Sequence, residues 1–173
     1  MSGRSKEVWG WIRYMAAAAA AVFLITQSAG LSRVSGQSML PSLEDRDILL
    51  VNKLSRYLDE PSCGDVAIIA SSTLGYRLIK RVIGVPGNVV EIRDGIVYVD
   101  SQALPELYAV GMPEDMEAQR VKPGHVFVLG DNRDPGASLD SRNPKLGQVP
   151  SGEIEGYALL RLLPWGGIAG PLD

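Results

Sequence analysis

The sequence is poor in the residues that hold metals and form disulfides: its 173 residues include one cysteine, Cys63, and one histidine, His125. A single cysteine excludes an intramolecular disulfide, and one cysteine with one histidine is too few for a Cys/His metal site. We therefore expect no cofactor. Any Ser-His-Asp or Cys-His mechanism would have to use His125, which directly follows Pro123-Gly124 and is expected at the edge of a turn.

The chain also lacks an excess of positive charge. Its 17 lysine and arginine residues face 20 aspartate and glutamate residues, which gives a net charge of -3 and a pI near 5.2. No basic stripe and no cluster of aromatic and basic residues interrupts this balance. Since nucleic-acid-binding surfaces need such basic patches, we do not expect nucleic acid as a partner.

One long segment contains no charged residue at all. Residues 14–32 form a run of 19 residues bounded by Arg13 and Arg33. A helix of that length spans about 28 Å, close to the roughly 30 Å hydrocarbon core of a bilayer. Trp9 and Trp11 precede it, at the position where interfacial aromatic residues collect. We therefore predict a transmembrane anchor at residues 14–32.

The flanking charges predict the orientation of this anchor. Three basic residues precede it, whereas Arg33 alone follows closely. The positive-inside bias then predicts that residues 1–13 are cytoplasmic and that residues 33–173 form an extracytoplasmic domain of a single-pass cell-membrane protein. A cleaved signal peptide would have similar regions. Its candidate end at residues 27–29, however, lacks a small residue three positions before the cut, which favours a retained anchor.

Beyond the anchor, short apolar runs alternate with turn residues. Asp94-Gly95 between two alternating runs is a strong hairpin signal, and Pro-Gly pairs mark further turns. We predict a mainly β domain, a curled antiparallel, β-barrel-like sheet behind one N-terminal transmembrane helix, with loops at 103–120 and 143–148. The predicted strands cover residues 47–53, 65–70, 76–84, 89–93, 96–100, 125–130 and 154–163.

Lys80 has an unusual set of neighbours on the predicted strand 76–84. Alternate residues of a strand share a face, so Lys80 is the one charge on a face with Tyr76, Leu78 and Val82. A lysine among apolar side chains loses hydration, which lowers its pKa and makes a neutral amine available as a base. The alternative is an edge strand whose lysine extends its ammonium to water. The strand alone leaves both interpretations open.

Two further segments carry candidate functional groups. Ser38 lies in the irregular segment 36–43, five residues beyond Arg33. Even an extended chain therefore keeps it within about 17 Å of the membrane boundary. Residues 130–142 are dense in aspartate and arginine, which we interpret as mutually paired charges that hold a long loop rigid.

In their order along the chain, these segments resemble the type I signal peptidases, the membrane-anchored Ser-Lys proteases of bacteria. The resemblance covers nearly the whole chain, through the anchor and residues 38–41, 80–87 and 130–142. It implies that Ser38 is the nucleophile, that Lys80 is the general base and that Ser138 orients the lysine. It also implies that the backbone N–H of Ser38 forms half of the oxyanion hole. The substrates would be exported preproteins, and the further partners the lipid bilayer and the secretion translocon.

Besides the milder changes at Ser42 and Asn88, the sequence departs from the family pattern in three respects. Two extra residues lie between Asp134 and Asp140, so Ser141 is the alternative to Ser138 as the orienting serine. Gly36 stands where some members supply a hydroxyl to the oxyanion hole, so a second donor must come from elsewhere. The long insertions of some members are absent, which indicates a compact form.

Other functions stay open on the sequence alone. A self-cleaving Ser-Lys regulator would have to cut near residues 29–30, and it would carry a membrane helix where a DNA-binding module is expected. Two alternatives remain: a peptidase dedicated to one secreted substrate, such as a pilin, and an inactive membrane-anchored scaffold of the same fold. A panel of preproteins would separate the first from a general signal peptidase, and a cleavage assay in detergent tests the second.

Overall fold

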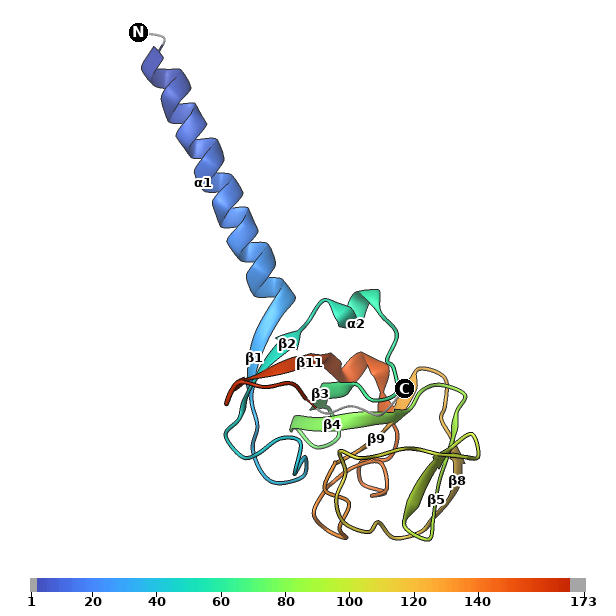
Figure 1. Cartoon of the computed structure of the whole chain (residues 1–173). Helices are drawn as coiled ribbons and strands as arrows, with labels where there is room; N and C mark the ends of the chain where they lie inside the picture. Colours follow the sequence, from blue (N-terminus) through green and yellow to red (C-terminus); the bar gives the residue numbers. More distant parts are fainter. Residues whose placement is uncertain (1–2, 169–173) are drawn as a thin grey trace.

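The computed structural model describes residues 3–168 and contains one long helix that projects from a β domain (Figure 1). Helix α1 (Gly3–Ser28) is exposed along nearly all of its described side chains. Its stretch Glu7–Ser28 is long and apolar enough to cross a membrane. The helix ends before the predicted anchor does, because residues from Ala29 onward already pair with a neighbouring strand. Transmembrane placement stays a prediction.

The β domain is built almost entirely from short antiparallel strands. Its two small helical elements are α2 (Ser55–Leu58) and a 3-10 turn (Ser151–Glu153). The strands are β1 (Ala29–Arg33), β2 (Ile48–Asn52), β3 (Val66–Ser71), β4 (Tyr76–Gly84), β5 (Val89–Arg93), β6 (Ile96–Val99), β7 (Gln102–Ala103), β8 (Met116–Arg120), β9 (His125–Leu129), β10 (Val149–Pro150) and β11 (Ile154–Leu163).

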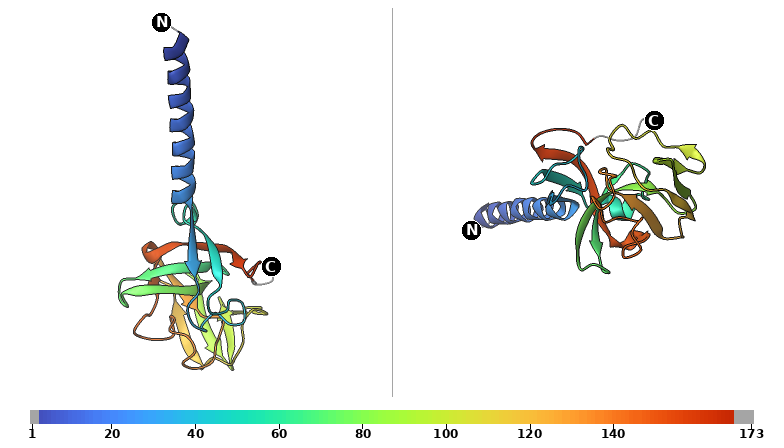
Figure 2. Two further views of the ribbon diagram at one scale, coloured as in Figure 1. Left: turned by 90° about the vertical axis from the view of Figure 1, so that its left-hand side faces the viewer. Right: turned by 90° about the horizontal axis from the view of Figure 1, so that it is seen from below.

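These strands form two sheets (Figure 2). The larger has the order β1-β2-β11-β3-β4-β9-β10, and the smaller has the order β7-β6-β5-β8. Every ladder between these strands is antiparallel. The predicted mainly β, antiparallel class is therefore confirmed, with the strands divided between two sheets.

The strongest sequence signals gave the best-placed elements. Strands β4, β5 and β11 have the predicted bounds, and Asp94-Gly95 forms the two-residue turn between β5 and β6 with positive φ at both residues. Strand β8 was missed because it lies in the stretch 103–120 that was predicted to be a loop. Four of its five residues are exposed, so it carries no apolar alternation to detect.

Three buried clusters hold the domain together. Alternate residues of β3 belong to different clusters: Ala67 and Ile69 to one, and Val66 and Ile68 to another. Because strand side chains alternate between faces, these two clusters cover opposite faces of the larger sheet. The third cluster joins the two sheets, and consists of Ile83, Val90, Ile92, Val97, Val121, Phe127 and Leu129. Strand β4 contributes side chains to all three clusters. The backbone that carries Lys80 is therefore held by packing on both faces of the strand.

Candidate active site

Ser38 lies in the segment between β1 and β2, and its buried neighbours hold it in place. Met39 and Leu43, just beyond it, are 1% and 0% exposed and anchor this segment on the larger sheet. From the other side, the backbone N–H of Asn132 donates to the carbonyl oxygen of Ser38 at 3.1 Å. The backbone of Ser38 is therefore fixed, while its side chain is half-buried and lines a cleft.

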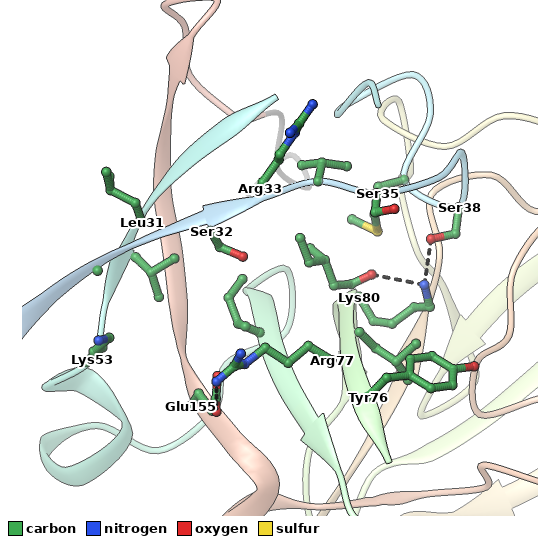
Figure 3. Close-up of a pocket in the computed structure, with 17 residues that line it drawn as sticks. Leu31, Ser32, Arg33, Ser35, Ser38, Lys53, Tyr76, Arg77, Lys80 and Glu155 are labelled. Atoms are coloured by element: carbon green, nitrogen blue, oxygen red, sulfur yellow. Dashed lines mark hydrogen bonds and ion pairs between the residues drawn. The ribbon is translucent and has the colours of Figure 1, made fainter. Parts of the chain in front are cut away.

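The side chain of Lys80 reaches Ser38 from strand β4. Its Nζ donates to the Oγ of Ser38 at 2.6 Å and to the carbonyl oxygen of Ile79 at 3.0 Å (Figure 3). Lys80 is 2% exposed, and among residues 3–168 no carboxylate forms an ion pair with it. The interpretation in which this lysine extends to water is therefore wrong.

The environment of Lys80 favours the neutral amine. Burial lowers the pKa of Lys80 from 10.5 to about 8, because the ammonium loses its hydration. Asp140 and Asp131 act against this and raise the pKa. Their influence is limited because each is paired with an arginine, Arg142 and Arg81 respectively. About half of the lysine side chains would be neutral at pH 8.

Ion pairs hold the charged loop 130–142, but only the pair of Asp140 with Arg142 is internal to the loop as predicted, because Asp131 and Arg133 pair with Arg81 and Glu106 outside it. Asp140 accepts two hydrogen bonds from Arg142, at 2.9 and 2.8 Å. Burial alone would raise the pKa of Asp140, but these bonds hold it below its ordinary value. Asp131 accepts two from Arg81, at 2.8 and 2.6 Å, and both side chains are almost fully buried. Arg81 directly follows Lys80 in β4, so the ion pair between Arg81 and Asp131 holds the loop next to the lysine.

Glu106 and Tyr108 belong to the same network, although the sequence analysis assigned them to a plain polar loop. Glu106 accepts hydrogen bonds from Arg133 at 2.7 and 2.5 Å and from the hydroxyl of Tyr108 at 2.8 Å. The Tyr108 ring lies 3.9 Å from the Arg81 guanidinium. Nothing in the local sequence distinguishes Glu106 from its acidic neighbours, because its partner Arg133 lies 27 residues further along the chain.

Ser138 and Ser141, the two candidates for the orienting serine, have different surroundings. The Oγ of Ser141 accepts a hydrogen bond from the backbone N–H of Val128 at 2.9 Å. The Oγ of Ser138 is buried and makes no hydrogen bond of ordinary geometry, although it lies near enough to Asp140 to help lower the pKa of that carboxyl. It packs against Gly130, where an added Cβ would collide with both Ser138 Oγ and the carbonyl oxygen of Ser38. Ser138 therefore lies close to the nucleophile segment, but it makes no hydrogen bond to Lys80.

A cleft of about 560 Å³ leads to Ser38 and Lys80. One wall is β1 with the residues that follow it, and the other is the first half of β4 (Figure 3). Strand β1 pairs with β2 alone, and β9 pairs with β4 only from Arg81 onward. Each wall therefore has a strand edge without a partner among the described residues. Arg77 donates to Glu155 at 2.7 and 3.0 Å within the same cleft.

The single histidine and the single cysteine lie outside this cleft. The Nδ1 of His125 is 3.0 Å from the carbonyl oxygen of Pro123, which fits the predicted place at a turn. Cys63 is exposed. Between residues 3 and 168, no group of three or more His, Cys, Asp or Glu side chains is arranged to hold a metal ion. The groups that face each other in the cleft are thus a hydroxyl and an amine.

Known proteins are similar to this chain in sequence and in fold. The family model described as signal peptidase, peptidase S26, matches residues 8–165. A probable signal peptidase I-1 of Synechocystis sp. is 41% identical over 145 residues, which cover 77% of this chain and 72% of the relative. Signal peptidase I of Bacillus amyloliquefaciens is 32% identical over 174 residues, or 94% of this chain and 89% of the relative.

A solved structure agrees with these sequence matches. The crystal structure of a signal peptidase I from Enterococcus faecalis superposes with a TM-score of 0.50 at 32% identity. The match covers 57% of this chain and 97% of that one. Because the family model spans most of the chain and close relatives align along most of their length, the chain belongs to the signal peptidase family, peptidase S26.

Proposed function

We propose that this protein cleaves signal peptides from exported preproteins, with Ser38 as nucleophile and Lys80 as general base. The observation that carries the proposal is the 2.6 Å contact between Lys80 Nζ and Ser38 Oγ, made by a lysine that is 2% exposed. Membership of the signal peptidase family supplies the reaction class. The Ser-Lys pair supplies a chemistry that needs no histidine.

In the first step, neutral Lys80 accepts the proton of the Ser38 hydroxyl while Oγ attacks the scissile carbonyl carbon. The resulting ammonium then donates this proton to the leaving amine as the C–N bond breaks, which leaves an acyl-enzyme ester on Ser38. Water hydrolyses the ester with Lys80 again as base, and the enzyme returns to its starting state. At the lysine's ordinary pKa, about one molecule in a few thousand would be neutral at pH 7. The lowered pKa removes most of that deficit.

The oxyanion of the tetrahedral intermediate needs hydrogen-bond donors near Ser38. We assign one of them to the backbone N–H of Ser38. Gly36 has no hydroxyl to offer as a second donor, and its own N–H is bonded to Asp45 at 3.0 Å. The side-chain amide of Asn132 donates to the carbonyl oxygen of Gln37 at 3.3 Å, which supports this assignment because that carbonyl shares a peptide unit with the Ser38 N–H.

The substrate is proposed to bind as an extended chain along the cleft. The unpaired edges of β1 and of the first half of β4 line its two walls. An extended peptide between them would form backbone hydrogen bonds to either edge, and the cleft would lead its scissile bond to Ser38. This mode of binding tolerates varied sequences, as preprotein processing requires, because most contacts are to the backbone.

Helix α1 is proposed to hold this cleft at the outer surface of the cell membrane. Its 22-residue stretch Glu7–Ser28 would span about 33 Å. Ser38 follows only ten residues after Ser28, so the site would face chains that emerge from the bilayer or from a translocon. The exposed Trp9 and Trp11 fit the cytoplasmic interface.

Cleavage of a model signal peptide by the full chain in detergent tests the proposal. We expect Ser38→Ala and Lys80→Ala each to abolish cleavage while the protein stays folded. The matched controls are Ser62→Ala and Lys122→Ala, which alter an exposed serine and an exposed lysine outside the cleft. Turnover near the wild-type rate in either active-site variant would refute the mechanism. Cleavage of only one preprotein from a panel would indicate a dedicated peptidase.

A further inference from the structure

Glu106 lies outside the cleft, yet it begins a chain of contacts that ends at Ser38. Its carboxylate binds both terminal nitrogens of Arg133, at 2.7 and 2.5 Å. Arg133 is 2% exposed and Glu106 12% exposed at the side chain, so this charge pair is shielded from water. A buried arginine without its carboxylate would be strongly unfavourable, which makes Glu106 the group that keeps Arg133 in place.

Arg133 transmits this constraint to the backbone of Gly130. Its Nε donates to the carbonyl oxygen of Gly130 at 2.7 Å. On the other side, the N–H of Gly130 donates to Asp140 at 3.1 Å. The two peptides that flank Gly130 are thus held by two charged groups. Both Asp140 and Arg133 belong to the loop 130–142, but Arg133 depends on Glu106, which lies between β7 and β8 of the smaller sheet.

Gly130 in turn lies directly against the nucleophile. A Cβ at Gly130 would collide with the carbonyl oxygen of Ser38, so the two backbones are already in close contact. Two residues later, the N–H of Asn132 donates to the same carbonyl at 3.1 Å. A shift of the backbone at residues 130–132 would therefore move the peptide of Ser38.

We propose that Glu106 is a positioning residue for Ser38, acting through Arg133 and the Gly130 backbone. This inference rests on the proposed role of Ser38 as nucleophile. It gives the loop between β7 and β8 of the smaller sheet a part in catalysis, because that loop helps to fix the position of the nucleophile relative to the lysine. Positional errors of about 1 Å can reduce turnover by roughly a hundredfold, so small displacements suffice.

Glu106 acts on geometry and not on the charge of Lys80. The charged groups that shift the pKa of Lys80 are Asp140, Asp131 and Arg142. Glu106 is not among them, which separates its expected kinetic signature from that of Asp140. Loss of Glu106 should reduce the rate of the chemical step at every pH, while the pH at which the rate is half-maximal stays near 8.

The test measures kcat, KM and the pH dependence of model signal-peptide cleavage for the full chain in detergent. In Glu106→Gln, the neutral amide cannot compensate the Arg133 charge. We expect kcat to fall roughly tenfold to a hundredfold, with KM within about twofold of wild type and the pH midpoint unchanged. Glu106→Asp keeps the charge but shortens the reach, so a smaller loss is expected. The matched control is Glu91→Gln, which removes a 3.5 Å ion pair with Arg93 in the smaller sheet and should leave kcat unchanged.

The outcomes separate this inference from the proposed function. An inactive wild-type protein would refute the proposed function. An active wild type with wild-type kcat in folded Glu106→Gln would refute the positioning role alone. A kcat loss accompanied by a shifted pH midpoint, or a loss that follows the fraction of unfolded protein, would also refute it. If Glu106→Gln does not fold, Glu106→Asp decides by the same criteria.

Discussion

The Nζ of Lys80 and the Oγ of Ser38 lie 2.6 Å apart, although 42 residues separate them in the chain. The serine belongs to the segment after β1 and the lysine to β4, so the folding of the larger sheet is what brings them together. The lysine is buried and has no carboxylate ion pair within residues 3–168. An amine in that position can act as a base only in its neutral form, which makes the pH dependence of the reaction informative.

The rate of cleavage should rise with pH and level off above about 8. Lys80 has a pKa lowered to about 8, and only its deprotonated form can accept the Ser38 proton. We expect log(kcat/KM) to increase with a slope near one below that pH, measured with a substrate that does not itself titrate. A profile that is flat between pH 6 and 8 would contradict the assignment of Lys80 as base.

Replacement of Asp140 by asparagine should move this midpoint to lower pH. Asp140 raises the pKa of Lys80, so removal of its charge leaves desolvation less opposed. Asparagine has nearly the same shape and keeps an acceptor for the N–H of Gly130. The matched control is Asp134→Asn, an exposed carboxylate of the same loop that should leave the midpoint unchanged. A midpoint that moves to higher pH in Asp140→Asn would show that the local electrostatics have been misread.

The sequence identified the motifs that contain Ser38 and Lys80. It predicted the burial and the ion pairs of the surrounding residues only in part. The alternation in β4 indicated that Lys80 points toward apolar residues, and Leu78 and Val82 do lie in one buried cluster. Tyr76, expected on the same face, is 53% exposed because it begins the strand at the rim of the domain. Charge density predicted the pair of Asp140 with Arg142, but not that Asp131 pairs with Arg81 of β4.

Contacts between distant, locally unremarkable segments could not be predicted. Strand β1 was assigned to the membrane anchor, because its small and apolar residues continue the uncharged run of α1. Glu106 lies among several acidic residues, and only the fold selects the one that meets Arg133. The side-chain hydrogen bond expected between Ser138 and Lys80 depends on one rotamer in a loop with two extra residues, which no sequence pattern specifies.

Lys80→Met should stabilise the protein near neutral pH. The folded state lowers the pKa of Lys80 from 10.5 to about 8, so between these values the unfolded chain binds more protons than the folded one. Wild-type stability therefore rises with pH across this window, by about 3 kcal/mol for a shift of roughly 2.5 units. In Lys80→Met this contribution to the free energy of unfolding does not vary with pH. The variant should therefore be more stable than wild type at pH 7, and the difference should shrink by about 3 kcal/mol between pH 7 and 10.5.

Denaturant unfolding of the full chain in detergent at several pH values measures this difference. Lys53→Met, which alters an exposed lysine of the same cleft, is the control and should show no comparable trend. If the difference between Lys80→Met and wild type does not change with pH, the lysine is not held in an environment that disfavours its charge.

Ser138→Ala tests whether this serine orients Lys80. Its buried Oγ makes no hydrogen bond of ordinary geometry, although it helps to lower the pKa of Asp140, so loss of the hydroxyl should reduce the free energy of unfolding by at most about 1 kcal/mol. We nevertheless expect kcat to fall by about tenfold or more, if the hydroxyl bonds the amine during the reaction. Ser141→Ala provides the contrast, because it leaves the N–H of Val128 unsatisfied and should cost about 1–3 kcal/mol of stability. Wild-type activity in Ser138→Ala would exclude an orienting role.

Gly130→Ala should reduce cleavage by roughly a hundredfold or more. A Cβ at this position would collide with the Ser38 carbonyl oxygen and the Ser138 side chain, and the Ser38 contact is with backbone that cannot rotate away. Relief of the collision must therefore displace either the loop 130–142 or the nucleophile, and a displacement of about 1 Å reduces turnover by roughly a hundredfold. Cleavage of a model signal peptide and thermal unfolding, measured together, distinguish misplacement from loss of the fold.

Gly152→Ala is the matched control for this substitution. No atom lies within 4 Å of the position that its Cβ would occupy, so both activity and stability should be retained. Glu106→Gln and Gly130→Ala should also be non-additive in kcat, because both act on the backbone that abuts Ser38. Full activity in folded Gly130→Ala would mean that the loop can move without carrying the nucleophile with it. That result would remove the physical basis for any influence of Arg133 and Glu106 on the reaction.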